Sequence, residues 1–297
     1  MSSPLLVVRK AVAAAIDGPA VVACSGGADS LALAAGSAMQ RWPMQAVVID
    51  HGLQAGSADI AQVAAQQCRG LGLDVTVQRV QVGTHGGPEA AARTARYAAL
   101  RELADGLPIL LAHTLDDQAE TVLLRLARGS GSRSLQAMAA ADWDLRRPLL
   151  GLRRELVRAA CAEAGLQPHE DPHNGDPRYA RSRLRQHGLP ALVEDLGAGV
   201  VLGLARSAAN LREDNAALDL WAAQAHTDDV AALAALPKAV LVRVIRSLSL
   251  AAGCPPAALT REHLLAVAAL IEDWRGQGPI HLPGGVRAAR ESGRLVL

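Results

Sequence analysis

The sequence has very few aromatic residues: phenylalanine is absent and aromatics make up only 2% of 297 residues. The core must therefore be built from alanine, leucine, valine and isoleucine. A platform of several aromatic rings that stacks single-stranded bases is not expected. Net charge is also small, because 30 lysines and arginines face 29 acids and leave +1. No global basic field indicates a nucleic-acid partner, so any such partner must contact local patches.

Paired cysteines and long apolar runs are absent as well. The four cysteines stand far apart, and the sequence offers no C-x-x-C pair for zinc or an iron–sulfur cluster. Near the N-terminus, Arg9 and Lys10 interrupt an apolar stretch after five residues. That stretch is too short for a signal peptide or a membrane span. We therefore predict a cytoplasmic protein with reduced cysteines and no membrane partner.

The first half of the chain alternates short apolar runs with stretches of helical spacing. Strands are expected at residues 20–24, 46–50, 75–80 and 108–112, and RRPLL at 146–150 is a candidate fifth strand. Helices are expected at residues 5–16, 29–40, 58–71, 88–105 and 152–164. Continuously apolar strands that alternate with helices predict an α/β fold, with a parallel sheet covered by helices on both faces.

The pattern changes to helices alone from about residue 192, with segments near 199–225, 238–252 and 261–274. The final stretch, PIHLPGGVRAARESGRLVL, has two alternating apolar runs around turn residues and predicts a terminal hairpin. We place the domain boundary after residue 212. Residues 1–212 then form the α/β domain, and residues 213–297 form a smaller, mainly helical domain.

A glycine-rich segment lies between the first expected strand and the helix that follows it. Its glycines allow a sharp turn with inward-facing N–H groups, and the helix adds the positive end of its dipole, so the segment predicts a phosphate cradle. It is not a Walker A loop, because that motif requires a lysine. Two alternatives are a nucleophile elbow with Ser25 as nucleophile and a plain helix cap. The segment consists of Ser25, Gly26, Gly27, Ala28, Asp29 and Ser30.

A second polar segment, AHTLDDQAETVLLRLARGSG, follows the fourth expected strand at residues 112–131. Strand ends are where open sheets bind ligands. Asp116 and Glu120 are four residues apart on one helix face, and with Asp117 they could bind Mg²⁺ or an ammonium group. The alternative is structural, because T-x-x-D resembles a capping box and the helix dipole favours acids in a first turn. His113 is more typical of a buried, hydrogen-bonded histidine.

Arginines are concentrated between residues 125 and 185, where 12 arginines against seven acids leave +5. Arg181, Arg183 and Arg185 alternate over five residues with no acid between them. Guanidinium groups in this arrangement are suited to binding a polyphosphate or an RNA backbone. A solvated helix face is the alternative for any single arginine.

Four motifs in this order resemble the tRNA(Ile)-lysidine synthetase family of PP-loop ATP pyrophosphatases. They are SGGADS at 25–30, DHGL at 50–53, HTLDDQAET at 113–121 with RGSG after it, and DPHNGDPRYARSRLR at 171–185. SGGxDS marks the wider PP-loop group, whereas DDQAET with RGSG and the late cluster of Asn, Tyr and Arg are much more specific. The resemblance is close over residues 20–190 and is to a short form of the family. The chain departs from the family pattern at Pro172-His173 and at Ser182.

The resemblance implies an ATP-dependent ligase that joins L-lysine to carbon 2 of the wobble cytidine in the CAU anticodon of tRNA(Ile). Expected cofactors are ATP and Mg²⁺, and a homodimer is left open. For catalysis it implies Asp29, Asp116, Asp117, Glu120, Arg181 and Arg183, with Asp29 and Asp117 as metal ligands. For ATP it implies residues 25–30, Asp50, His51 and His113, and for RNA it implies Arg128, Arg133 and Arg185.

Three alternatives belong to different classes. Another PP-loop enzyme, such as a tRNA thiolase, would need paired cysteines or a persulfide carrier. A non-enzymatic RNA-binding protein would not keep a nucleotide loop. The esterase predicted by the elbow interpretation would need no ATP and would lose ester cleavage in Ser25→Ala.

Overall fold

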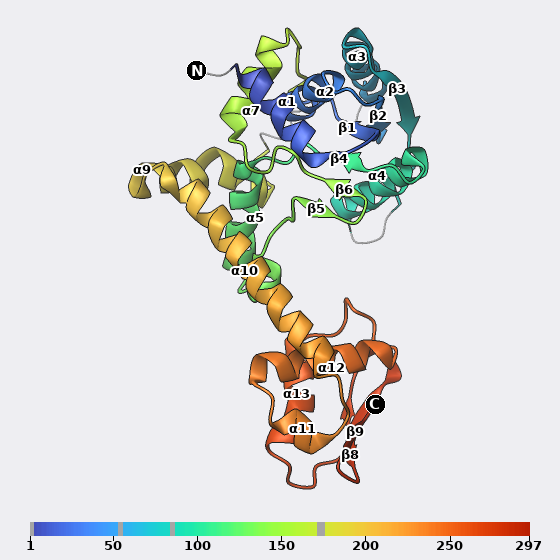
Figure 1. Ribbon diagram of the computed structural model, residues 1–297, viewed down its shortest axis with the longest axis vertical. Coiled ribbons are helices and arrows are strands. Elements are labelled where there is room, and N and C mark those ends of the chain that lie inside the picture. The colour runs from blue at the N-terminus through green and yellow to red at the C-terminus, as the bar shows by residue number, and fades with distance from the viewer. Residues whose placement is uncertain (1–2, 53–55, 84–86, 171–175) are drawn as a thin grey trace. The chain divides into compact units, whose positions relative to one another are not determined.

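The chain folds into two compact units, residues 1–209 and 210–297, in a computed structural model (Figure 1). The structure describes residues 3–52, 56–83, 87–170 and 176–297. The division falls inside helix α10, Gly199–Gln224, three residues before the boundary placed from the sequence.

A six-stranded sheet in the order β3-β2-β1-β4-β6-β5 forms the centre of the first unit. All neighbouring strands pair in parallel except β5 and β6, which are antiparallel. The α/β fold predicted from the sequence is therefore confirmed. The strands are β1 Ala20–Cys24, β2 Met44–Asp50, β3 Asp74–Arg79, β4 Ile109–Leu110, β5 Ala141–Asp142 and β6 Leu145–Arg146.

Helices cover both faces of this sheet. Because successive side chains of a strand point to opposite faces, neighbouring residues of one strand enter different apolar cores. On β1, Val22 packs into one apolar core with α1, α2, α3 and α7, whereas Val21 packs into a second core with Leu100 of α4. Figure 1 shows α1, α2 and α7 grouped together, as their contacts require. The helices are α1 Pro4–Ala15, α2 Ala28–Ala38, α3 Ser57–Gly70, α4 Pro88–Ala104, α5 Leu115–Ala127, α6 Ser132–Leu135, α7 Arg154–Glu163, α8 Ala180–Arg183 and α9 Leu189–Leu196, with the π-helical turn η2 at Leu184–Gly188.

The candidate fifth strand at 146–150 is wrong in its extent. The strand observed there, β6, ends at Arg146, and residues 148–151 form turns. Pro148 has no N–H to donate to a sheet, which explains the early end. The neighbouring strand β5 was not expected, because two residues are too few to show a pattern.

The second unit combines helices with a small antiparallel sheet in the order β7-β8-β9. The expected terminal hairpin has a third strand, because residues 279–297 contain two turns, one at Gly284–Gly285 and one at Ser292–Gly293. The apolar side chains of α12 and α13 form its core. Its elements after α10 are α11 Val230–Ala234, α12 Lys238–Ala251, α13 Arg261–Glu272, β7 Ile280–His281, η3 Pro283–Gly285, β8 Arg287–Glu291 and β9 Arg294–Val296.

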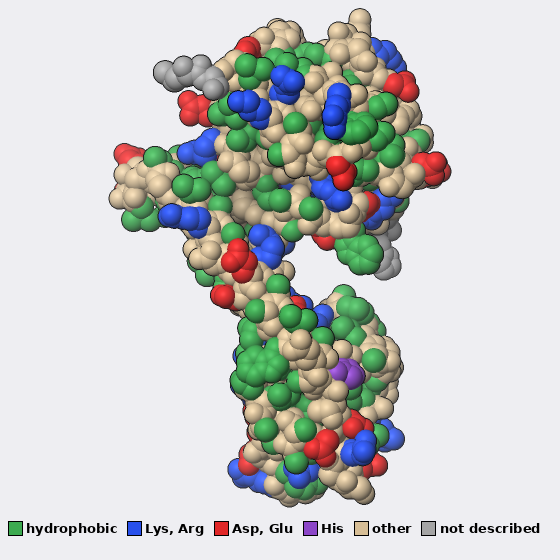
Figure 2. Space-filling view, in the orientation of Figure 1, with side chains coloured by type: hydrophobic (Ala, Val, Ile, Leu, Met, Phe, Trp, Pro, Cys, Tyr) green, Lys and Arg blue, Asp and Glu red, His purple; other side chains and the backbone are tan. Residues whose placement is uncertain are grey.

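Charges are interspersed on the face of the molecule drawn in Figure 2, with basic and acidic side chains side by side. All four cysteines are free and buried. No described helix is by itself long and apolar enough to cross a membrane, although the bent pair Ala180–Leu196 and Gly199–Gln224 passes that test jointly.

Candidate active site

The glycine-rich loop joins β1 to α2 and is closed by its own hydrogen bonds. Ser30 Oγ accepts a hydrogen bond from Ser25 N at 3.1 Å and donates one to Gly27 O at 2.9 Å. Gly26 has φ +82°, and a Cβ there would lie 3.1 Å from Ala64 Cβ of α3. A left-handed backbone against a neighbouring helix explains why glycine occupies this position.

The loop has the features of an anion site. The first N–H groups of α2 have no partner within the helix, and the helix dipole places partial positive charge there. A phosphate bound at this point would satisfy both. Ser25 Oγ lies 3.2 Å from Ser30 Oγ, and among the described residues it has no hydrogen bond to a histidine. The elbow interpretation of Ser25 therefore gains no support from the geometry.

The acidic segment starts α5 directly after β4, and its capping box is confirmed. Asp117 Oδ2 accepts hydrogen bonds from Thr114 N at 2.8 Å and from Thr114 Oγ1 at 2.7 Å. The same carboxylate also enters an ion-pair cluster, because its Oδ1 accepts from Arg154 at 2.8 Å and from Arg185 at 3.0 Å. The structural and functional interpretations of Asp117 are thus compatible.

Arg154 connects the acidic segment with the glycine-rich loop. Its guanidinium, 13% exposed, donates to Asp117 Oδ1 and to Glu120 Oε1, the latter at 2.9 Å. Its Nε lies 3.8 Å from Asp29 Oδ2, at the start of α2. Glu120 is fully buried and also accepts from Arg185 at 2.9 Å. Acids from two separate motifs therefore converge on one arginine. We call Asp29, Asp117, Glu120, Arg154 and Arg185 the arginine–carboxylate cluster.

Asp116 has a different role from its neighbour. Its Oδ2 accepts from the backbone N of Arg154 at 2.7 Å, and Arg153 donates to the same carboxylate at 3.2 Å. Asp116 thus caps the first turn of α7, whose own N-cap residue, Arg153, makes no side-chain cap. A carboxylate at a helix N-terminus satisfies the free N–H groups and the dipole. Asp116 therefore positions Arg154 for the cluster.

The charge state of Asp29 is set by its burial, which raises its pKa to about 6; the opposing effect of Arg154 is smaller. Its Oδ1 is buried and has no hydrogen-bond partner among the described residues. Asp117 has a lowered pKa, because its bonds with Arg154, Thr114 and Arg185 outweigh the burial that would raise it. An ionised Asp117 next to a partly protonated Asp29 gives two carboxylates with separate properties.

Mg²⁺ fits Asp29 better than Asp117. Mg²⁺ commonly keeps several waters and binds through one or two carboxylates together with substrate phosphates. The partnerless Oδ1 of Asp29 matches that mode, whereas both oxygens of Asp117 already accept hydrogen bonds. Within the described part of the chain, no group of three acidic, histidine or cysteine side chains could hold a metal unaided. A metal here would need phosphate oxygens as ligands.

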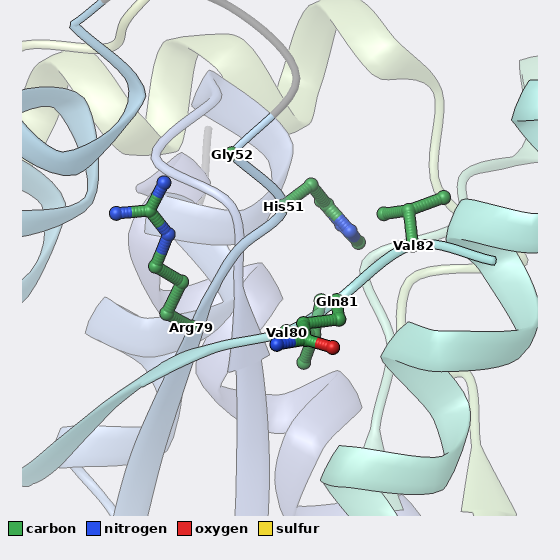
Figure 3. A pocket seen from close by; sticks show the side chains of 6 residues that line it. All are labelled: His51, Gly52, Arg79, Val80, Gln81 and Val82. Carbon is green, nitrogen blue, oxygen red and sulfur yellow. The ribbon is translucent and has the colours of Figure 1, made fainter.

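A hollow lies at the carboxyl ends of β2 and β3. His51, Gly52 and Arg79 line it together with residues 80–82, and Figure 3 shows the His51 ring pointing towards Val82. Asp50 beneath it is 5% exposed and accepts from Gly52 N at 2.9 Å. Burial would raise the pKa of Asp50, but this bond, together with Ser57 and Arg79, lowers it. Leu53 of the DHGL motif lies outside the described residues.

Both candidate histidines are held uncharged. Burial lowers the pKa of His113 to about 4, and it also lowers the pKa of His51. Each Nδ1 is buried and has no hydrogen-bond partner among the described residues. Neutral imidazole rings with an unused nitrogen can bind a substrate group by hydrogen bonding.

The three alternating arginines are separated by helical geometry. Because they lie on α8 and η2, Arg181 and Arg185 share a face, and both contact Glu120. Arg183 is exposed and donates instead to Pro177 O and Arg178 O, at 2.6 and 3.0 Å. Alternation over five residues would bring all three together only in an extended segment. Pro172-His173-Asn174 lies outside the described residues.

Arg128 and Arg133 lie away from the cluster. Arg128 is the C-cap of α5, eleven residues beyond Asp117, a distance of about 16 Å along a helix. Arg133 follows in α6. The structure thus brings Asp29, Asp117 and Glu120 together and leaves these two arginines at the other end of α5.

Sequence reasoning did not select Arg153 and Arg154, which it counted only within the basic stretch. The sequence does contain a signal for them. Arg153 and Arg154 stand at the start of α7, where the helix dipole disfavours cations. Cations in that position imply specific carboxylate partners.

A parallel sheet with a glycine-rich loop after its first strand is typical of nucleotide-binding α/β proteins, and a match over residues 8–192 assigns this one to the PP-loop class of ATP-binding enzymes. A family model described as "PP-loop domain" matches residues 8–192, and one described as "TilS substrate binding domain" matches residues 229–296. The chain belongs to the tRNA(Ile)-lysidine synthase family. The family resemblance inferred from the four motifs is thereby confirmed.

Relatives with about half their residues identical carry this family name. A tRNA(Ile)-lysidine synthase of Thermobifida fusca is 50% identical, covering 99% of this chain and 97% of the relative. One of Leifsonia xyli is 52% identical, covering 93% and 88%. Among solved structures, a U34-tRNA thiolase of Methanococcus maripaludis with a [4Fe-4S] cluster shares the fold at 18% identity and TM-score 0.56, covering 71% of this chain and 78% of that one. The thiolase alternative therefore rests on fold alone.

Proposed function

We propose that this enzyme forms lysidine on tRNA(Ile) with the residues of the arginine–carboxylate cluster and the glycine-rich loop. The observation that carries the proposal is the meeting of Asp29, from the loop, with Asp117 and Glu120 around Arg154. A phosphate cradle beside buried carboxylates can bind the leaving pyrophosphate through its N–H groups and the incoming amine through the carboxylates, within one site. The family names of the relatives support this assignment.

The reaction has two balanced steps. Oxygen 2 of the wobble cytidine attacks the α-phosphate of ATP, and the bond to pyrophosphate breaks. The ε-amine of L-lysine then attacks carbon 2 of the activated base, loses a proton, and AMP leaves. Charge accumulates on pyrophosphate in the first step, and preorganised N–H donors at the start of α2 are placed to stabilise it. Ser25 and Ser30 hold that loop in shape.

Asp29 is the residue proposed to hold Mg²⁺, through its partnerless Oδ1. The ion would supply charge neutralisation for the triphosphate. Arg154 orients Asp29 from the other side, and it leaves that oxygen without a partner. His51 lines the hollow proposed to bind the adenosine half of ATP, and Asp50 holds that hollow in shape by accepting a hydrogen bond from Gly52 N.

Glu120 and Asp117 are the carboxylates proposed to bind the lysine ammonium. Their oxygens accept from arginines in this structure, so the ammonium must replace one guanidinium. The ion pair between Arg181 and Glu120 is the weakest of these contacts, because it spans 3.6 Å and the Arg181 side chain is 44% exposed. Arg181 is therefore the guanidinium that the ammonium is proposed to replace. Displacement of Arg181 would also free it to bind phosphate. Neutral His113 could hydrogen-bond the substrate nearby.

Contacts with tRNA are proposed for the remaining basic residues and for the second unit. The exposed guanidinium of Arg183 is suited to an anticodon-loop phosphate, as are those of Arg128 and Arg133. Arg185, in contrast, is held by Asp117 and Glu120 within the cluster. The substrate-binding match over residues 229–296 supports recognition of tRNA by the second unit. A cytoplasmic location and a homodimer belong to this proposal, and neither affects the test that follows.

The test is incorporation of labelled lysine into a tRNA(Ile) transcript with a CAU anticodon, in the presence of ATP and Mg²⁺. We expect stable labelling of this tRNA and none of the initiator methionine tRNA, which shares the anticodon. Pyrophosphate release without lysine transfer would keep the PP-loop class and reject lysine as the substrate. Labelling in the absence of ATP would contradict the mechanism.

A further inference from the structure

Trp143 is the most exposed large apolar side chain among the described residues, at 94%. It occupies the two-residue turn between β5 and β6, and its φ is +50°. That left-handed conformation is a rare one for a bulky residue, and such outliers are concentrated at functional positions. The whole chain has only four tryptophans, two tyrosines and no phenylalanine. A fully exposed indole on a left-handed turn is therefore a candidate contact for a ligand.

The backbone that carries Trp143 is fixed on both sides. Arg146 donates to Trp143 O at 2.7 Å, and Asp144 O accepts from Ile109 N at 2.7 Å. Arg101 of α4 forms a two-point ion pair with Asp144, at 2.7 and 3.4 Å. The ring is thus presented by a preorganised turn, which lowers the entropy cost of binding.

A basic and aromatic face of α4 continues from this turn. Arg93, Tyr97 and Arg101 are spaced four residues apart and share one face of the helix. The guanidinium carbons of Arg93 and Arg101 lie 4.9 and 5.8 Å from the Tyr97 ring centroid, which orients both groups. Arg101 also lines an open hollow with Trp143 and Asp144. We call Trp143 and these three α4 residues the α4–turn strip.

The strip leads away from the candidate active site. Tyr97 packs against the apolar core that contains Leu111, two residues before His113, so the strip begins beside the segment that carries His113. From Arg93 to Arg101 the helix rises about 12 Å, the length of a few nucleotides. The nearby acids are Asp142 and Asp144, and Asp144 is already paired with Arg101.

We propose that the α4–turn strip binds nucleotides of the tRNA substrate that flank the reacting base, with the Trp143 indole packed on one base and the arginines on phosphates. Single-stranded loops of RNA expose bases that stack on aromatic rings and guanidinium planes. One indole suits one base, and the low aromatic content excludes a broader platform. The inference rests on the proposed function only for the identity of the RNA.

Direct binding of a full-length tRNA(Ile) transcript to the full chain tests the strip, with the dissociation constant measured by fluorescence anisotropy. Trp143→Gly removes the ring and tolerates the positive φ, whereas Trp143→Phe keeps a ring. One stacked base contributes about 1–3 kcal/mol, so we expect Trp143→Gly to weaken binding at least fivefold. Trp143→Phe should stay within about threefold of the wild type, and ATP affinity should be unchanged in both.

Two further variants separate the ring from general surface effects. Val63→Ala shortens another exposed apolar side chain, 53% exposed on α3, and should leave tRNA affinity unchanged. Arg101→Gln should reduce the slope of log affinity against log salt by about 0.7–0.9, the amount for one phosphate contact.

Equal tRNA affinity of Trp143→Gly and the wild type would overturn the inference, and equal losses in the Gly and Phe variants would do so too. If the wild type incorporates lysine and Trp143→Gly binds tRNA with normal affinity, only the proposal that the strip binds tRNA is refuted. A wild type that binds tRNA through Trp143 but never transfers lysine would refute the proposed function and leave the strip standing.

Discussion

Replacement of Arg154 by methionine tests whether the cluster depends on this one guanidinium. Arg154→Met keeps an unbranched side chain and removes the charge that contacts Asp117 and Glu120, which are 12% and 0% exposed. Removal of one partner of a buried ion pair costs about 3–5 kcal/mol, because a charge is left uncompensated. Arg185 still contacts both acids, so we expect the lower end, about 3 kcal/mol.

Thermal unfolding at neutral pH measures this effect. For a unit of this size, 1 kcal/mol corresponds to about 2–4 °C, so the first unit of Arg154→Met should unfold about 6–12 °C below the wild type. Arg158→Met, an exposed arginine one turn further along α7, is the matched control and should shift the midpoint little.

A double variant identifies the cause of the loss. Glu120→Gln removes the buried negative charge that Arg154 neutralises, so adding it to Arg154→Met should cost less than the two separate losses combined, by at least about 1 kcal/mol. An unfolding midpoint of Arg154→Met within 2 °C of the wild type would refute the reasoning. Strictly additive losses would show that Arg154 and Glu120 are not coupled.

Three further predictions concern the loop and its metal. Asp29 has a pKa of about 6 when folded against an ordinary value of 3.8, so stability is lost as the pH rises from about 4 to about 6, and the loss is complete above that range. Asp29→Asn should therefore raise the free energy of unfolding by about 2–3 kcal/mol at pH 7.5 and should lose that gain as the pH falls to 4, which denaturant titrations at both pH values check. The same variant should abolish pyrophosphate release in an ATP-cleavage assay. Gly26→Ala should lose pyrophosphate release because of its φ of +82° and the Ala64 contact, whereas Gly18→Ala, with nothing within 4 Å, should not; equal activities would contradict the loop geometry. Chelation of Mg²⁺ with EDTA should stop pyrophosphate release reversibly and leave thermal unfolding unchanged, since a metal is proposed to bind only with the triphosphate; a lowered unfolding midpoint in EDTA would indicate a structural metal instead.

The local sequence determined the elements and the loop. Continuous apolar runs indicated the main strands, because strands covered on both faces bury successive side chains, and a period of 3.6 indicated the helices that cover them. The two glycines after β1 predicted the turn, and Gly26 indeed has a left-handed backbone. The Thr114–Asp117 spacing predicted the capping box, which is closed within three residues. Each of these features depends on neighbours along the chain.

Only the tertiary structure decided how the charged side chains divide their roles. Asp116 and Asp117 are adjacent, yet one caps α7 and the other joins the arginine–carboxylate cluster. Arg154 reaches Glu120 across 34 positions of sequence, and Arg185 reaches Asp117 across 68. Such partners are fixed by the packing of α5, α7 and η2, and no local periodicity encodes that packing. The sequence thus supplied the loop and the carboxylates, and the fold selected which of them meet.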